Sequence, residues 1–252
     1  HPNPRLLHDF YHTMVVPMAD FMAGYIDPVT GLPKPSYDLW EEVYLTSTYT
    51  TSVVYAALLA AAELAELSND ADSAVKWRSA ADDILAAAHK HLYNADRKAF
   101  YKGIIVKDGQ IEYNQTIDTS SVFGAFMFGL FPVGSEELDG ALESMTAAFQ
   151  VDGSVSGLPR YEDDNYCRVG GGVPPNWWPI ASLWLAQYHI ETGQSDSATS
   201  ILNWVKAHMG STGILSEQIN PLTNTPISVA PLTWSHAEYV ATLLDTRTEK
   251  KV

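Results

Sequence analysis

Apolar residues recur at helical spacing along most of the chain. Between positions 5 and 26 they fall at Leu7, Phe10, Met14, Met18 and Phe21, which is typical of one buried face of an α-helix. The alanine-rich stretch 47–67 is apolar almost all round, as expected of a helix buried among other helices. Further helices are predicted over 71–93, 120–131, 135–150, 178–192, 195–208 and 232–245.

The connections between these segments alternate in length. Phe100-Tyr101 and Glu112-Tyr113 flank Asp108-Gly109, a pattern that predicts a small β-hairpin. Longer polar loops follow at 153–175 and 210–231. We therefore predict an all-α toroid of helical hairpins with about eight helices, in which the long loops gather at one end and form a pocket.

Composition narrows the class of protein. A chain of 252 residues with 46% hydrophobic residues is globular, and we expect residues 1–252 to form a single domain. The net charge of −15 argues against nucleic acid and anionic membranes as partners, and we find no apolar run long and charge-free enough to span a membrane.

Cys167 is the one cysteine, so no intrachain disulfide can form. This permits a cytoplasmic location, which we favour over secretion without excluding the latter. The start His1-Pro2-Asn3-Pro4 is neither a signal peptide nor a natural initiator, so we expect a processed chain or part of a larger one.

The first candidate for chemistry is the stretch 35–43, where Tyr37, Leu39 and Trp40 lie among Asp38, Glu41 and Glu42. An aromatic ring beside carboxylates suits a sugar site, because the ring covers the apolar face of a pyranose while the acids bind hydroxyls or move protons. The alternative is a helix start, whose first turn acidic residues stabilise.

Two other loops carry a similar mixture of residues. One contains Arg160, Tyr161 and Asp164 and leads to Trp178, and the other contains Glu217 with Trp234 beyond it. Two carboxylates from separate loops are what glycoside hydrolysis needs, since one protonates the leaving oxygen and the other activates water or attacks carbon.

Each of these residues also has an ordinary structural interpretation. Arg160 could form a surface ion pair with Asp163 or Asp164, and Glu217 could be a solvated surface residue. Trp178 and especially Trp184 could belong to the core, and His236 to a packed helix start. No pair of histidines has convincing metal spacing, so we predict neither a catalytic metal nor another cofactor.

Taken together, several strings in register resemble glycoside hydrolase family 15, the glucoamylase family. They are Ser36-Tyr37-Asp38-Leu39-Trp40-Glu41-Glu42, Arg160-Tyr161 with Asp163-Asp164 and Tyr166, Trp178 with Leu183-Trp184-Leu185-Ala186-Gln187-Tyr188, Ser216-Glu217-Gln218, and Pro231-Leu232-Thr233-Trp234-Ser235-His236-Ala237.

The resemblance implies an (α/α)6 barrel that hydrolyses α-glucosidic bonds from the non-reducing end with inversion. It implies that Glu41 is the general acid and Glu217 the general base. It places Arg160 and Asp164 on the hydroxyls of the innermost sugar. The other substrate-binding candidates are Asp38, Trp40, Glu42, Tyr161, Trp178 and Trp234.

The chain also departs from the family pattern. Family members have about twelve barrel helices, and the match begins near the fifth, so the chain resembles the later two-thirds of a catalytic domain. Uncovered apolar helix flanks are costly, so we expect another chain, a twin protomer or an N-terminal segment to complete the barrel unless the piece is stable alone.

Three alternatives to a glucoamylase-type hydrolase remain. The first is a non-catalytic glycan-binding or structural fragment, since helices that contribute to the pocket are missing. The second is a trehalase of the same family, which Glu42 disfavours. The third is a phosphorylase, which needs a phosphate site, although only Arg160 and Arg168 lie near the base in sequence.

Overall fold

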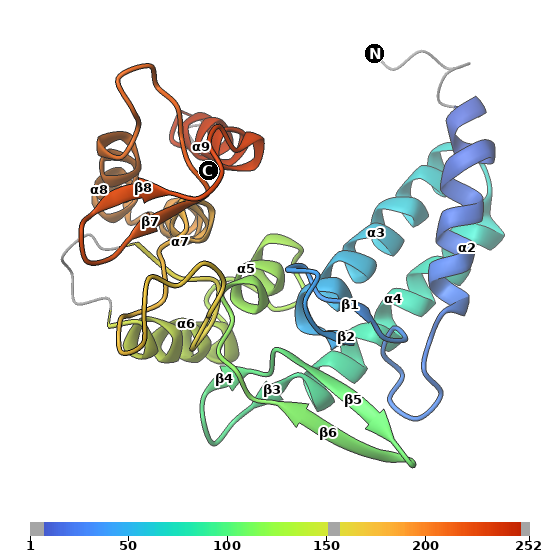
Figure 1. Ribbon diagram of the computed structural model, residues 1–252. Coiled ribbons are helices and arrows are strands. Elements are labelled where there is room, and N and C mark those ends of the chain that lie inside the picture. The colour runs from blue at the N-terminus through green and yellow to red at the C-terminus, as the bar shows by residue number, and fades with distance from the viewer. Residues whose placement is uncertain (1–7, 151–156, 248–252) are drawn as a thin grey trace. The chain divides into compact units, whose positions relative to one another are not determined.

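The computed structural model describes residues 8–150 and 157–247. Within these ranges the chain forms eight α-helices, one π-helical turn and three small antiparallel sheets (Figure 1). Its contacts divide it into two compact units, each described here by itself. Unit 1 comprises the residues up to Gln115 together with 124–132, and unit 2 comprises 116–123 together with the residues from Val133 onward. The prediction of a single domain over 1–252 stays a prediction.

Three helices form the framework of unit 1. A π-helical turn η1 (Tyr11–Val15) continues into α2 (Val16–Gly24), with Pro17 in the first turn of α2. Proline has no N–H to donate, so an irregular turn ahead of it is expected. Helices α3 (Thr48–Leu67) and α4 (Ala71–His91) run side by side as a hairpin, and α2 packs along both (Figure 1).

Side chains close both helix starts of this hairpin. The Ser47 hydroxyl accepts the N–H of Thr50 at 3.0 Å at the start of α3. The Asp70 carboxylate accepts the N–H of Ser73 at 3.1 Å at the start of α4. Each cap satisfies a donor that the helix itself cannot pair.

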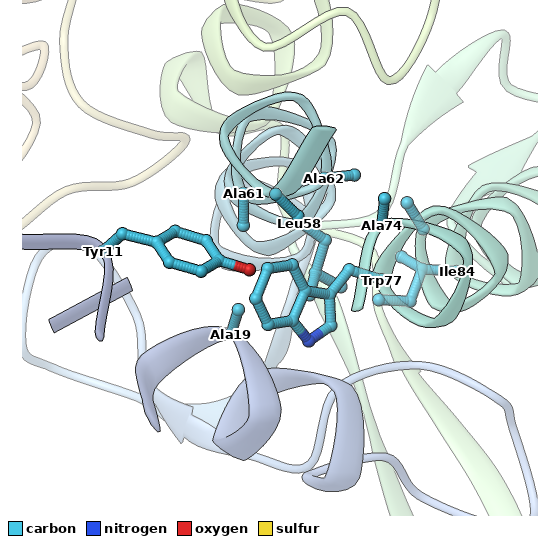
Figure 2. Close-up of a cluster of buried hydrophobic side chains, with 10 residues drawn as sticks. Tyr11, Ala19, Leu58, Ala61, Ala62, Ala74, Trp77 and Ile84 are labelled. Carbon is cyan, nitrogen blue, oxygen red and sulfur yellow. The ribbon is translucent and has the colours of Figure 1, made fainter. Parts of the chain in front are cut away.

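The core of unit 1 is built around Trp77 of α4, whose side chain is fully buried. Figure 2 shows Trp77 between Tyr11 and Ala19 on one side and the small residues of α3 on the other. Ala61 and Ala62 let the two helices approach closely, since a methyl group needs little space between backbones. The two polar atoms at this core are also paired, because the Trp77 indole donates to Asp20 at 2.9 Å and the Tyr11 hydroxyl donates to Asp70 at 2.8 Å.

The opposite face of η1 and α2 is apolar and exposed. Large side chains recur there three or four positions apart, at Phe10, Met14, Met18, Phe21 and Tyr25, and all are exposed. We call these five residues the apolar stripe. Contiguous apolar surface of this kind on a helix usually marks a contact with another element.

Helix α3 corrects one sequence-based expectation. Its 20 residues are long and apolar enough, by length and composition alone, to cross a membrane. However, Leu58, Ala61, Ala62 and Ala65 pack into the core of unit 1, and a core helix passes the same test. We therefore interpret α3 as a core helix of this unit.

A four-stranded sheet of order β1-β2-β5-β6 completes unit 1. Its hairpin of β5 (Gly103–Lys107) and β6 (Gln110–Asn114) turns through Asp108 and Gly109, both with positive φ, which confirms the predicted hairpin. The strands β1 (Ser36–Tyr37) and β2 (Tyr44–Ser47) hold the loop 38–43 between them. The small pair β3 (Tyr93–Asn94) and β4 (Ala99–Phe100) lies beyond α4.

Unit 2 is organised around α7 (Pro179–Glu191), of which residues 179–188 are all buried. It packs against α8 (Ser195–Ala207) and α9 (Thr233–Asp245), and α6 (Glu136–Ala148) belongs to the same unit. The short hairpin β7 (Gln218–Asn220) and β8 (Thr225–Ile227) precedes α9. Helix α5 (Thr119–Met127) begins in unit 2 and ends in unit 1.

All eight predicted helices are confirmed, with ends that differ by a few residues; residues 5–7 of the first predicted helix lie outside the described residues. Of the eight strands that the structure describes, only the hairpin β5–β6 was predicted; the short strands β1, β2, β3, β4, β7 and β8 were not. Within the stretch 35–43, Ser36 and Tyr37 form β1 and residues 38–43 form the loop that leads to β2, so the alternative of a helix start is wrong; the next helix begins at Thr48. The first part of the predicted loop 153–175 and the end of the chain lie outside the described residues.

Candidate active site

The acidic loop of unit 1 is built on a buried ion pair. The Asp38 carboxylate lies 2.9 Å from the Lys102 ammonium, and both side chains are buried. The same carboxylate accepts the backbone N–H groups of Glu42 at 2.9 Å and Val43 at 3.1 Å. The Asp38 carboxylate therefore holds the loop 38–43 in its conformation. The predicted contact of Asp38 with a sugar stays a prediction.

The loop geometry presents two carboxylates outward. Glu41 has a φ of 59°, a left-handed conformation that is uncommon outside glycine, and its N–H donates to the Asp38 carbonyl at 3.0 Å. Glu41 and Glu42 are exposed, while Trp40 is buried. A tight turn held in this way fixes where the Glu41 side chain leaves the backbone.

In unit 2, Arg160 and Asp164 form a bidentate pair. The Arg160 Nε and Nη2 atoms each donate to one Asp164 oxygen at 2.7 Å. The two residues are only 3% and 2% exposed, so the alternative of a surface ion pair is wrong. Asp163, by contrast, is exposed and has a φ of 57°.

Aromatic rings surround this guanidinium. The Arg160 Cζ atom lies 5.1 Å from the ring centroid of Tyr161 and 4.9 Å from those of Tyr166 and Trp178. Cation–π attraction and exclusion of water strengthen such a pair. The backbone of Trp178 is fixed directly before α7, because its backbone N–H donates to the Leu158 carbonyl at 2.7 Å.

Glu217 is held at the entrance to the β7–β8 hairpin. Its N–H donates to the Val229 carbonyl at 2.8 Å, which fixes the backbone. Its side chain is half-buried, and the Oε2 atom accepts hydrogen bonds from Gln218 Nε2 at 3.1 Å and from the Ser228 hydroxyl. The alternative of a freely solvated surface glutamate is therefore wrong.

A second aromatic group lies on α7 and α9. Trp184 is buried and stacks on Phe123 with ring centroids 4.4 Å apart, which confirms its assignment to the core, and it contacts Trp234 at 5.9 Å. Glu238 accepts a hydrogen bond from Gln187 at 2.6 Å, and the side chains of Trp184 and Trp234 also interact with its carboxyl group. Burial raises the pKa of Glu238, an effect that the interactions with Gln187, Trp184 and Trp234 oppose in part.

His236 has a packing role, as expected. Its Nε2 atom accepts the N–H of Leu215 at 3.0 Å at the start of α9. In the part of the chain that the structure describes, no group of three or more His, Cys, Asp or Glu side chains could hold a metal ion.

The structure groups the predicted residues in two sets. Asp38, Trp40, Glu41 and Glu42 share one loop of unit 1, while Arg160, Tyr161, Asp164 and Trp178 share one cluster of unit 2. Glu217 and Trp234 also lie in unit 2. Sequence reasoning missed Lys102, Ser228 and Glu238, and it gave no role to Asn176 and Gln218, although Asn176 directly precedes Trp177-Trp178 and Gln218 directly follows Glu217.

Comparison with known proteins gives a consistent result. The family model described as Glycosyl hydrolases family 15 matches residues 29–194 and 189–244. An uncharacterized glycosyl hydrolase of Methanocaldococcus jannaschii is 30% identical over 231 residues, a match that covers 86% of this chain and 35% of that protein. A glucoamylase of Clostridium sp. (strain G0005) is 27% identical over 270 residues, covering 97% of this chain and 37% of that protein. The chain thus spans only about a third of the length of these relatives.

Solved structures show the same fold. A bacterial glucoamylase complexed with acarbose superimposes with a TM-score of 0.77 at 24% identity, covering 93% of this chain and 37% of that chain. Glucoamylase from Saccharomycopsis fibuligera gives a TM-score of 0.76 at 17% identity, with 97% and 63% covered. The fold is therefore that of part of an (α/α)6 glucoamylase barrel, as predicted.

Proposed function

The chain belongs to family 15 of the glycosyl hydrolases, and we propose that it supplies the acid and the base of an inverting, exo-acting α-glucoside hydrolase. In this proposal Glu41 is the general acid and Glu217 the general base. The substrate is an α-glucan or a gluco-oligosaccharide, from whose non-reducing end β-glucose is released.

The observation that carries the proposal is the way in which Glu217 is held. Within the described ranges of the chain, both hydrogen bonds to its carboxylate side chain end on the same atom, Oε2. The Oε1 atom is then the one that accepts a proton from the attacking water. A base fixed through one oxygen can orient water with the other, which is the positioning that an inverting mechanism requires.

The proposed reaction needs no covalent intermediate. Glu41 donates its proton to the glycosidic oxygen as the bond from this oxygen to C1 breaks. Water attacks C1 from the opposite face and gives its proton to Glu217, so the product is β-glucose and the two carboxyl groups exchange protonation states. For this outcome the two carboxyl groups must lie roughly 6.5–9.5 Å apart, which leaves room for the water.

The Arg160–Asp164 pair suits the recognition of sugar hydroxyls. Its charges are fixed by two bonds of 2.7 Å and surrounded by aromatic rings, so little reorganisation is needed on binding. We assign Arg160, Tyr161, Asp164 and Trp178 to the innermost sugar site. Asp38, Trp40, Glu42 and Trp234 are proposed as the other residues of the substrate site.

Glucose release tests the proposed function. Maltose, maltotriose, isomaltose and trehalose are offered to the protein and to its Glu217→Gln variant. The proposal predicts glucose from at least one malto- or isomalto-oligosaccharide and almost none from the variant. Release from trehalose alone would identify a trehalase, and binding of oligosaccharide without release would favour a non-catalytic glycan-binding protein.

We also propose that amphipathic helices cover the apolar stripe, as in a complete barrel. The exposed stripe on η1 and α2 and the 37% coverage of the bacterial glucoamylase support this assignment. The test is co-expression with the helices that precede the matched region in the Clostridium glucoamylase. Met14 and Met18 should then resist oxidation by peroxide, whereas equal oxidation with and without those helices would contradict the proposal.

A further inference from the structure

A chain of buried amides leads to the Glu217 carboxylate. Asn176 Nδ2 donates to the Cys167 carbonyl at 2.8 Å and to Gln218 Oε1 at 2.6 Å. Gln218 Nε2 then donates to Glu217 Oε2 at 3.1 Å. Asn176 is 2% exposed and Gln218 is 0% exposed, so neither amide exchanges these partners for bulk water.

The direction of this chain follows from its first member. A backbone carbonyl can only accept, so the Asn176 side chain must place its nitrogen beside Cys167. The second N–H of this nitrogen meets Gln218, which must therefore present its oxygen there and its nitrogen to Glu217. Rotating either amide by half a turn would bring two oxygens or two nitrogens together.

The backbone fixes the register of the two amides. Trp177 and Ile219 exchange a pair of backbone hydrogen bonds of 3.0 and 2.8 Å. Each residue directly follows one of the amides. Because the two segments run antiparallel, Asn176 and Gln218 are diagonal neighbours on the same face, within reach of each other's side chains.

We propose that Asn176 is a positioning residue for the general base: through Gln218 it holds Glu217 by Oε2, so that Oε1 faces the attacking water. This inference rests on the proposed function of Glu217. Asn176 itself contacts no reacting atom, and its effect reaches the reaction only through the Gln218 amide.

The kinetic test is the Asn176→Ala variant of the protein, assayed on the substrate that releases glucose fastest. A misplaced base slows the step that transfers the proton from water, so kcat should fall roughly 10- to 100-fold while KM changes less than about twofold. The matched control is Asn203→Ala, at an exposed position of α8, which should leave both constants unchanged.

Azide separates positioning of the base from general damage. In Glu217→Ala the base is absent, and azide can attack C1 without losing a proton, forming β-glucosyl azide. Adding Asn176→Ala to this variant should leave the azide-supported rate unchanged, because there is no base left to position. A drop by the same factor as in the parent would show that Asn176 only maintains the fold, and would overturn the proposal.

A second measurement needs no activity. Side-chain amide signals of Asn176 and Gln218 are followed by nitrogen–proton NMR in the parent and in Glu217→Gln. Both amides should shift together, since the change at Glu217 replaces the charged acceptor at the end of the chain by a neutral amide. An unmoved Gln218 amide would refute the relay, whereas absence of hydrolysis in the parent with shifted amides would refute only the proposed function.

Discussion

The two carboxylates proposed for catalysis are held by different means. Glu41 depends on its backbone, because a left-handed φ and the Asp38–Lys102 pair below it set its direction. Glu217 depends on side chains, since Gln218 and Ser228 both bond its Oε2 atom. Substitutions around Glu41 should therefore affect stability first, and substitutions around Glu217 should affect turnover first.

Ser228→Ala tests the second half of that distinction. The variant loses one of the two donors to Glu217, and a net hydrogen bond of about 0.5–1.5 kcal/mol corresponds to a kcat lower by roughly two- to tenfold. KM on the same oligosaccharide should change little. Ser211→Ala, at an exposed position, is the control, and a kcat equal to that of the parent in Ser228→Ala would contradict the assignment.

Lys102→Met tests the first half. The variant leaves the Asp38 carboxylate buried without its cation, which should cost about 3–5 kcal/mol in the free energy of unfolding. Urea denaturation measures this loss. Adding Asp38→Asn removes the uncompensated charge and should recover part of it; an unchanged midpoint in the single variant would show that the pair does not support the loop.

Glu238 gives unit 2 a pH dependence. Burial raises its pKa above the usual 4.5, so the folded protein retains this proton at a pH where the unfolded chain has lost it. The protonated Glu238 side chain contributes its full share to stability below pH 4.5. This contribution is lost as the pH rises through the raised pKa of Glu238 in the folded protein. Glu238→Gln should therefore gain stability relative to the parent between pH 4 and 7, as measured by thermal unfolding at several pH values. A difference in unfolding temperature between Glu238→Gln and the parent that stays the same at every pH would contradict this account.

At the scale of elements, the helices could be predicted and most of the short strands could not. Helical spacing of apolar residues is a local signal, so α3 and α7 were found from sequence alone. Strands β1, β2, β7 and β8 have only two to four residues each, too short for an alternating pattern to stand out. Each of these strands pairs with another strand, and the sequence of the loop does not indicate which one.

The same limit applies to the candidate site. Arg160 and Asp164 are four residues apart, so their pairing could be anticipated. Asn176 and Gln218 are 42 residues apart and carry no charge, and nothing in either segment alone indicates that they meet. Lys102 likewise belongs to no recognisable sequence motif, and it meets Asp38 only in the folded chain.

Trp77 tests how much the hairpin of α3 and α4 depends on one side chain. Its indole fills the centre of the unit 1 core, so Trp77→Ala should cost about 3–5 kcal/mol in the free energy of unfolding. Trp77→Phe, which keeps much of the volume but loses the bond to Asp20, should cost less. Equal losses in the two variants, measured by urea denaturation, would show that the bond to Asp20 and not packing is decisive.

At the scale of the whole molecule, the proposed function requires residues from both units. One carboxylate belongs to each unit, so catalysis requires that both face one substrate. The apolar stripe on α2 and the coverage of about a third of the curated relatives support the need for further helices. Activity is therefore best measured on the protein with those helices co-expressed, as well as on the chain alone.

The most direct test of the central claim is the anomeric form of the first glucose released. Proton NMR follows the protein with its most rapidly cleaved oligosaccharide, together with the Glu41→Gln and Glu217→Gln variants. We predict that β-glucose appears first and that either variant nearly abolishes it. Release of α-glucose first, or full activity in either variant, would contradict the assignment of these two residues as the acid and base of an inverting hydrolase.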